Sequence, residues 1–475
     1  MFQFERNRIT IFNILFIPVL ICIWIIALFS GKIFDTQYAD TAILPIIFLL
    51  GYFFFLIIKK NRIFDIHLII ILLFFVKLYI LPILVLFNGG FDSQQYNAGL
   101  INHIFDAVLL QTIEWFVVII GLSFIKIERK EINIFERAVD SSINKKVWKV
   151  IFLCLFIIAL AIILYPSLLY KFRPIFFLSE EQEILWKQNS TVAVSSIHPL
   201  IYYPINWLIT VTRISFIYLL IIFIWKKCKN KSEIISIVFS FVVIAIGLVL
   251  IVPDDVAASI IAALGLFALM TKLYPKKSKQ IVFVVLITAG ILFVYMFFGR
   301  ALTTQNSFEQ LAKRLNAYFS GFINVAASFD MECDNKFSYF FGDFFRSFPI
   351  IKGFFVNMPT STELFNSALG YDTIYNSQII PMEGQAYFYF NYIGVIIIPI
   401  LILKICFYFY NKTLRAKGTY DYFINSFYSL ILAFGIVMYD SFLIFYICLS
   451  YVPLLIINIF IKRKGVKRNE RVNIS

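Results

Sequence analysis

The sequence predicts an all-α polytopic membrane protein with about twelve transmembrane helices. Hydrophobic residues make up 61% of the 475 residues and charged residues only 15%, so a water-soluble fold could not bury this much apolar surface. Apolar windows of about 20 residues, the length of a membrane-spanning helix, recur along the chain. One long polar stretch, residues 299–386, interrupts them and is far longer than a connection requires.

The expected spans follow from these windows. The seventh and eighth helices form a tight hairpin, as do the eleventh and twelfth. The windows lie near residues 9–30, 41–58, 63–87, 104–125, 150–169, 200–224, 234–252, 257–274, 281–298, 387–410, 422–440 and 442–461.

The spans divide the chain into four parts. Residues 1–298 hold nine helices, 299–386 form a large loop, 387–461 hold three helices, and 462–475 form a basic tail. The first apolar run is long enough to span and is followed by more spans, with no small-residue cleavage site between them. We therefore expect a retained helix and not a signal peptide.

The distribution of basic residues predicts the orientation. Segments on the side of the N-terminus carry 29 of the 42 lysine and arginine residues. Because basic residues gather on the cytoplasmic side, both termini are expected in the cytoplasm and residues 299–386 outside it. The net charge of +14 thus follows membrane topology and gives no indication of nucleic-acid binding.

Several chemistries receive no support from the sequence. His67, His103 and His198 are scattered and no cluster has metal-ligand spacing, so no metal or other cofactor is expected. Phosphate-binding glycine loops and GxSxG elbows are absent, which argues against a nucleotide-driven motor and a serine hydrolase. The loop holds a single cysteine, Cys333, and therefore cannot close its own disulfide.

The arginines of the loop are candidate ligands for a lipid diphosphate. Arg300 stands directly after the ninth span, at headgroup depth, and the guanidinium fork binds phosphate oxygens in pairs. Arg314 and Arg346 are further candidates. Arg314 and Tyr318 would share one face of a helix over Leu311–Ile323. Each arginine can alternatively be an interfacial anchor.

Glu383 is the candidate general base, because it lies at the membrane boundary where the loop leads into the tenth span. An ion pair that fastens the loop is the alternative. Within the spans, Arg213 could meet a phosphate, whereas Lys77, Asp106 and Glu114 are expected to pair with one another. His198, at an outer edge, could touch substrate.

Two motifs resemble the repeat-unit polymerases of the Wzy type, which build O-antigen and capsule. One is Glu383-Gly384-Gln385-Ala386-Tyr387 leading into Phe390-Asn391-Tyr392-Ile393-Gly394-Val395, and the other is Tyr339-Phe340-Phe341-Gly342-Asp343 with Phe348-Pro349. The resemblance covers about residues 295–400 and the overall topology.

The resemblance implies a GT-C-like membrane glycosyltransferase in the bacterial plasma membrane that uses no nucleotide sugar. It would transfer a growing glycan from one undecaprenyl diphosphate to the terminal sugar of another lipid-linked repeat unit. Arg300, Arg314 and Arg346 would hold the diphosphate and Glu383 would act as base or orient the acceptor. Gln385 and Asn391 belong to the matching motif. A chain-length regulator and a flippase are possible protein partners.

Two alternatives stay open. An O-antigen ligase shares the architecture but usually has a histidine late in the outer loop, and residues 299–386 contain none. A flippase or other transporter can have about twelve helices and would use cavity-lining charges such as Arg213, Lys77 and Glu114, but such proteins mostly have short loops.

Overall fold

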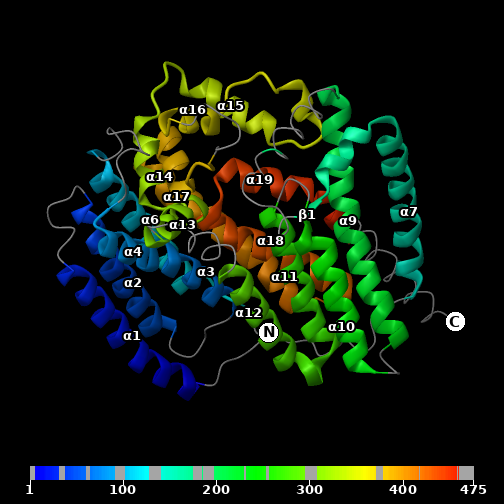
Figure 1. Ribbon diagram of the computed structural model, residues 1–475, viewed down its shortest axis with the longest axis horizontal. Helices are drawn as coiled ribbons and strands as arrows, with labels where there is room; N and C mark the ends of the chain where they lie inside the picture. The colour runs from blue at the N-terminus through cyan, green and yellow to red at the C-terminus, as the bar shows by residue number, and fades with distance from the viewer. Residues whose placement is uncertain are drawn as a thin grey trace.

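The computed structural model describes residues 6–30, 38–59, 65–90, 102–127, 141–174, 185, 197–228, 232–252, 256–294, 307–370, 378–416, 418–456 and 458. Within these ranges the chain is helical apart from turns, short irregular pieces and one antiparallel pair of two-residue strands. In that pair Arg173 of β1 (Arg173–Pro174) lies opposite Val252 of β2 (Ile251–Val252). The predicted all-α membrane class is confirmed (Figure 1).

The helices follow one another in three groups. The first is α1 (Arg6–Phe29), α2 (Leu44–Lys59), α3 (Asp65–Phe75), α4 (Leu81–Asn88), α6 (Ile104–Phe124), α7 (Ser141–Leu164), α9 (Pro199–Cys228), α10 (Glu233–Ile244), α11 (Val256–Leu273) and α12 (Ser278–Val294). The second, called the cap below, is α13 (Ser307–Tyr318), α14 (Phe322–Ala327), α15 (Lys336–Arg346) and α16 (Ser361–Ala368). The third is α17 (Met382–Leu414), α18 (Thr419–Met438) and α19 (Ser441–Ser450).

Fewer helices than the expected twelve are long and apolar enough to cross a membrane. In the described ranges six qualify, or seven if α11 and α12, which meet at 112°, count as one broken span. Shorter apolar helices stand where several other spans were expected. The last window, 442–461, contains α19, which ends after ten residues at Ser450. Twelve spans therefore remain a prediction.

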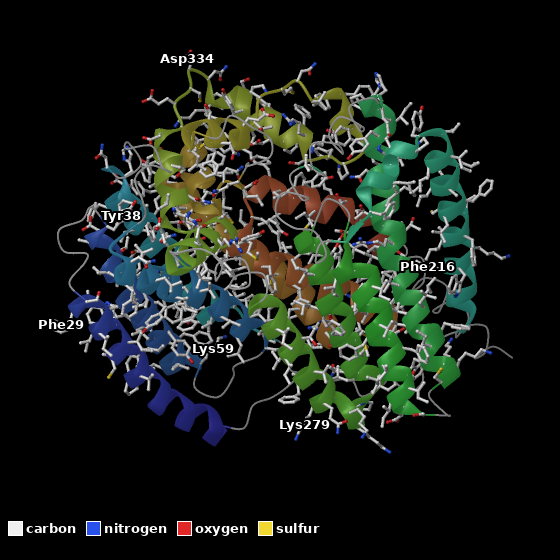
Figure 2. The ribbon with its side chains drawn as sticks, viewed as in Figure 1. Phe29, Tyr38, Lys59, Phe216, Lys279 and Asp334 are labelled. Carbon is white, nitrogen blue, oxygen red and sulfur yellow. The ribbon has the colours of Figure 1, made fainter. Side chains whose placement is uncertain are left out.

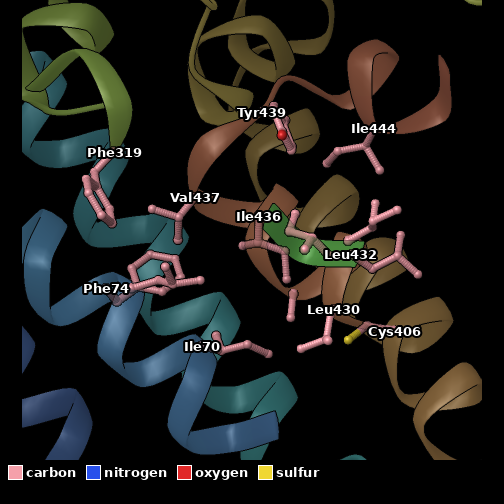
Figure 3. Close-up of a cluster of buried hydrophobic side chains, with 14 of the residues drawn as sticks. Ile70, Phe74, Phe319, Cys406, Leu430, Leu432, Ile436, Val437, Tyr439 and Ile444 are labelled. Atoms are coloured by element: carbon pink, nitrogen blue, oxygen red, sulfur yellow. The ribbon is translucent and has the colours of Figure 1, made fainter. Parts of the chain in front are cut away.

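Helix α18 lies at the centre of the core and is buried along almost its whole length. It packs against α3, α11 and α17, so its apolar side chains face protein on every side. Figure 3 shows Phe74 of α3, Phe319 from the cap and Val437 of α18 in one buried cluster. The cap thus contributes to the same core as the membrane helices.

A break in the cap corrects the helix expected over Leu311–Ile323. Helix α13 ends at Tyr318 and α14 begins at Phe322. Ser320 between them has a positive φ of 49°, and a Cβ on Gly321 would lie 2.3 Å from the Asn316 Oδ1 atom. That Oδ1 accepts the Ile323 N–H at 3.2 Å, so the Asn316 side chain replaces helical hydrogen bonds at the break.

Helix α17 also contains a break, at Asn391, whose φ of 53° and ψ of −150° are not helical. A Cβ on Gly394 would lie 2.3 Å from the Ala386 carbonyl oxygen. In a straight helix these residues would stand about 12 Å apart along the axis. The chain therefore folds back sharply at Asn391 and separates a lead segment, residues 382–390, from the longer helix 392–414.

We predict that Gly394→Ala destabilises the protein by about 1–3 kcal/mol, because the new methyl group meets rigid backbone at the fold-back. The midpoint of thermal unfolding in detergent measures the effect. Gly290→Ala in α12 is the matched control, since no atom lies within 4 Å of its Cβ position and alanine favours a helix. Equal midpoints for the two variants would contradict the fold-back.

Candidate functional site

Three ionisable side chains from distant parts of the chain meet inside the membrane helices. The Lys77 ammonium lies 2.8 Å from Glu114 Oε2 and 2.7 Å from Glu383 Oε1. All three side chains are completely buried. The predicted pairing of Lys77 with Glu114 is confirmed, and Glu383 at the start of the lead segment joins them. These three residues are called the buried triad below.

Because it belongs to the triad, Glu383 is buried and ion-paired, unlike a catalytic base that is open to substrate. Its partner is a lysine of the π-helical turn Val76–Ile80 between α3 and α4, 306 positions away in sequence. Desolvated ions of opposite charge hold each other strongly, because separating them leaves a charge without solvent. A proton transfer from substrate to Glu383 would require this contact to open. The geometry favours a role in holding the lead segment.

A second polar group lies along the other side of the lead segment. The Asp343 carboxylate of α15 accepts hydrogen bonds from Tyr389 at 2.7 Å and from the Ser361 N–H at 3.1 Å. The Gln385 amide donates to Asp440 at 3.2 Å, and its carbonyl accepts the Ser441 N–H at 3.1 Å. We call this group the aspartate cluster; it connects α15, α16, α17 and α19.

Burial raises the pKa of both carboxyl groups of the aspartate cluster. The pKa of Asp440 is raised to about 7, first by burial and further by the neighbouring Asp343 carboxylate. Burial also raises the pKa of Asp343, while its hydrogen bonds from Ser361 and Tyr389 act in the opposite direction. Burial therefore favours the protonated form of both carboxyl groups.

A third group was not expected from the sequence. Asp106 does not join Lys77, contrary to the prediction, and its Oδ2 atom lies 3.2 Å from Nδ1 of His103. The other ring nitrogen of His103 lies 3.3 Å from Oδ1 of Asp330 in the cap. No motif signals this contact, because Asp330 lies more than two hundred positions from the other two residues.

The loop arginines have different surroundings. Arg346 at the end of α15 donates 2.8 Å hydrogen bonds to the Met358 carbonyl and the Glu363 carboxylate, so it fastens the cap internally. Arg314 and Tyr318 lie four residues apart in α13, with Arg314 half-buried and Tyr318 half-exposed. Arg300 lies outside the described residues.

The remaining predicted residues lie apart from the triad in the fold or on the surface. Arg213 of α9 donates a hydrogen bond to the Ser259 hydroxyl of α11. His198 is exposed directly before α9, where its Nδ1 accepts the Leu200 N–H at 3.3 Å. Asn391 is exposed at the fold-back. Of the predicted residues, Glu383 and Gln385 meet buried ionisable groups and belong to the lead segment, whereas Arg346 pairs with Glu363 within the cap.

An apolar cavity of about 490 Å³ lies between α1, α2 and α6. Its wall includes Trp24, Ile43, Phe105 and Leu109, with Asp40 as its one charged lining residue among the described positions. Phe105 stands between His103 and Asp106 in sequence, so the cavity adjoins the end of α6 that contacts the cap. Its lining suits a hydrocarbon chain.

Comparisons with known proteins provide no relative. No protein-family model, curated protein or solved structure matches the chain.

We predict that Lys77→Met lowers stability by about 3–5 kcal/mol, because two buried carboxyl groups then face each other without a cation. Thermal unfolding in detergent measures the loss. Lys404→Met is the matched control, since Lys404 also lies in a span but is exposed. Adding Glu114→Gln and Glu383→Gln should recover part of the loss. A Lys77→Met protein as stable as the control would refute the triad's role.

We predict that the aspartate cluster makes stability depend on pH. Because the pKa of Asp440 is raised from 3.8 to about 7 on folding, its contribution is complete below pH 4 and lost as pH rises to about 7. Asp440→Asn keeps the acceptor for the Leu443 N–H but does not ionise. The variant should unfold at a higher temperature than wild type at pH 8, and the gap should narrow toward pH 5 and close below about pH 4. A gap independent of pH would contradict this.

Proposed function

We propose that the protein polymerises undecaprenyl-diphosphate-linked oligosaccharide repeat units into O-antigen or capsular polysaccharide. The growing glycan leaves one undecaprenyl diphosphate and joins the terminal sugar of another lipid-linked repeat unit. The proposal includes a GT-C-like arrangement of about twelve spans in the bacterial plasma membrane, with a chain-length regulator and a flippase as possible protein partners.

The observation that carries the proposal is that the cap packs on the membrane helices and that ionisable side chains lie where the two meet, a boundary called the seam below. Gln111 of α6 donates to the Ser320 carbonyl at 3.2 Å, and Ser347 donates to the Phe442 carbonyl at the same distance. A lipid-linked glycan has a hydrocarbon part and a hydroxyl-rich part. The apolar cavity beside α6 suits the first, and the half-exposed polar groups above it suit the second.

The proposed orientation rests on the sequence, in which 29 of the 42 lysine and arginine residues lie on the side of the N-terminus. Asp334 of the cap lies at the upper edge of the molecule and Lys279 at the lower edge (Figure 2). The cap would face the periplasm or cell surface, and the lysine-bearing ends of the helices would face the cytoplasm, as would both termini.

The residue roles in the proposal follow from position. Arg300 and Arg314 are the candidates for holding the diphosphate, whose negative charge grows as the bond to the sugar breaks. Arg346 would act indirectly, because Nη1 of its guanidinium already donates to Glu363 and to the Met358 carbonyl and so ties it to the cap. Glu383 would position the lead segment through Lys77. Gln385, Asn391, Tyr318, Arg213 and His198 remain candidates for glycan contact.

A ligase is the second candidate, and one observation favours it. The absence of histidine from residues 299–386 argues against a ligase, but His103 of α6 reaches the cap at Asp330. A histidine is therefore present at the seam. Product length separates the two activities, because a ligase transfers a finished chain and does not lengthen it.

We predict that cells lacking this protein make glycan of one repeat unit in place of a ladder on a gel. Wild type should restore the ladder and Arg300→Ala should not, at equal protein abundance, since the diphosphate would lose its bidentate partner. Arg415→Ala, at the cytoplasmic end of α17, serves as control and should restore it. Long lipid-linked chains that reach no acceptor would indicate a ligase, and repeat units held on the cytoplasmic leaflet a flippase.

A further inference from the structure

His103, Asp106 and Asp330 form a half-exposed polar cluster where α6 meets the cap. The imidazole lies between the two carboxylates, with both ring nitrogens in hydrogen-bonding range of carboxylate oxygens. Exposed fractions of the three side chains are 34%, 40% and 30%. A ring that donates both N–H groups fixes each carboxylate by one oxygen. Within the described part of the chain, Oδ1 of Asp330 is the oxygen beside His103, which leaves Oδ2 for a further hydrogen bond.

A row of aromatic rings leads away from this cluster. Phe329 stacks on His103 with ring centroids 5.5 Å apart and planes within 10°. Phe329 contacts Tyr387 at 4.8 Å, and Tyr387 contacts Tyr392 at 5.2 Å. Tyr392 is 43% exposed beside the fold-back at Asn391. The row therefore runs from a polar cluster to an exposed tyrosine.

The lead segment holds the two halves of this surface together. A Cβ on Gly384 would lie 2.6 Å from the Ser328 hydroxyl, so the first turn of α17 packs closely on the turn Ser328–Asp330 that carries the aspartate. Figure 1 shows α6, α14 and α17 side by side. A larger residue at position 384 would separate Asp330 from Tyr387.

We propose that this surface binds the acceptor sugar and that Asp330 is the general base for transfer. The inference rests on the proposed function and extends it to the acceptor. A sugar ring presents apolar C–H groups on its face and hydroxyls at its edge. Tyr387 and Tyr392 suit the face, and the carboxylates suit the hydroxyls.

The reaction step balances with the groups present. The acceptor hydroxyl gives its proton to Oδ2 of Asp330, and its oxygen forms a bond to the anomeric carbon of the donor glycan. The bond between that carbon and the diphosphate oxygen breaks, and undecaprenyl diphosphate leaves with the electron pair. Asp330 then releases the proton to water. His103 is a positioning residue, because it orients the carboxylate of Asp330 while Asp106 orients the ring.

The test uses full-length protein in liposomes that contain the host's undecaprenyl-diphosphate-linked repeat unit. The length of the product and the initial rate of its formation are measured. We expect Asp330→Asn to lower kcat by about 100-fold or more with little change in the acceptor KM. Tyr392→Ala should raise that KM by about three- to tenfold and spare kcat. His103→Gln should lower kcat per folded molecule without raising the acceptor KM, and it should shift the pH dependence of kcat, which a smaller folded fraction would not do.

Asp334→Asn is the matched control, because Asp334 is an exposed cap acid four positions from Asp330. It should polymerise at the wild-type rate. A wild-type rate for Asp330→Asn would overturn the inference while leaving polymerisation intact. If wild type makes no polymer, the proposed function fails. Binding of the free repeat-unit oligosaccharide can then be measured by calorimetry. Binding that Tyr392→Ala weakens and Asp330→Asn keeps would still support the sugar site. Equal binding by the two variants would refute it.

Discussion

A lysine buried between two carboxylates is the constraint on which the arrangement of this protein depends. Lys77 has no access to solvent, so its charge is stable there only while Glu114 and Glu383 remain in contact. The three residues belong to the α3–α4 unit, α6 and α17. A change in the relative position of any of these elements would strand a charge in an apolar interior. The triad therefore sets where the lead segment of α17 begins.

From that starting point, helical periodicity determines what the lead segment presents. Glu383 and Tyr387 are four residues apart and lie on one face, which packs along α6. Along α6, Glu114 and Asp106 are separated by about 12 Å. Glu383 and Glu114 share Lys77, and Asp106 lies toward the end of α6 where His103 contacts the cap.

The opposite face of the lead segment carries Gln385 and Tyr389, again four residues apart. Both reach the aspartate cluster, where they donate to Asp440 and Asp343. One short helix thus connects the buried triad, the cap and α19. The fold-back at Asn391 makes these contacts possible. In a straight helix the lead segment would lie on the axis of residues 392–414, and Tyr389 would be carried away from Asp343. The ψ of −150° at Asn391 lies outside the left-handed helical region that asparagine tolerates, so the surrounding contacts must hold this residue in a strained conformation.

The local sequence pattern predicted the helices and one buried ion pair, but it could not predict the contacts between residues far apart in the chain. Apolar windows identify the helices, and the rarity of charges inside them identifies Lys77 and Glu114 as partners. Glu383 reaches the same site from 306 positions away, a contact that periodicity does not encode. The break at Ser320 coincides with a Ser-Gly turn dipeptide inside an otherwise helical pattern, whereas the break at Asn391 occurs at a non-glycine residue with positive φ and has no such dipeptide. Asp106 is assigned wrongly, because its partner is the nearby His103, which Asp330 also reaches through the tertiary fold.

The same contacts bear on the choice between an enzyme and a transporter. A transporter that alternates between two access states needs charges lining a cavity whose walls move. In the described part of this chain, Lys77, Glu114 and Glu383 have no solvent access, and the cap is hydrogen-bonded to the membrane helices through Gln111 and Ser347. Rocking these elements would break buried ion pairs that nothing nearby replaces. A catalytic site has the opposite requirement, because reacting groups must stay within fractions of an ångström of their positions. The buried triad holds α6 and the lead segment together beside the half-exposed His103, Asp330 and Tyr387, and this contact supports our proposal of an enzyme with a fixed site.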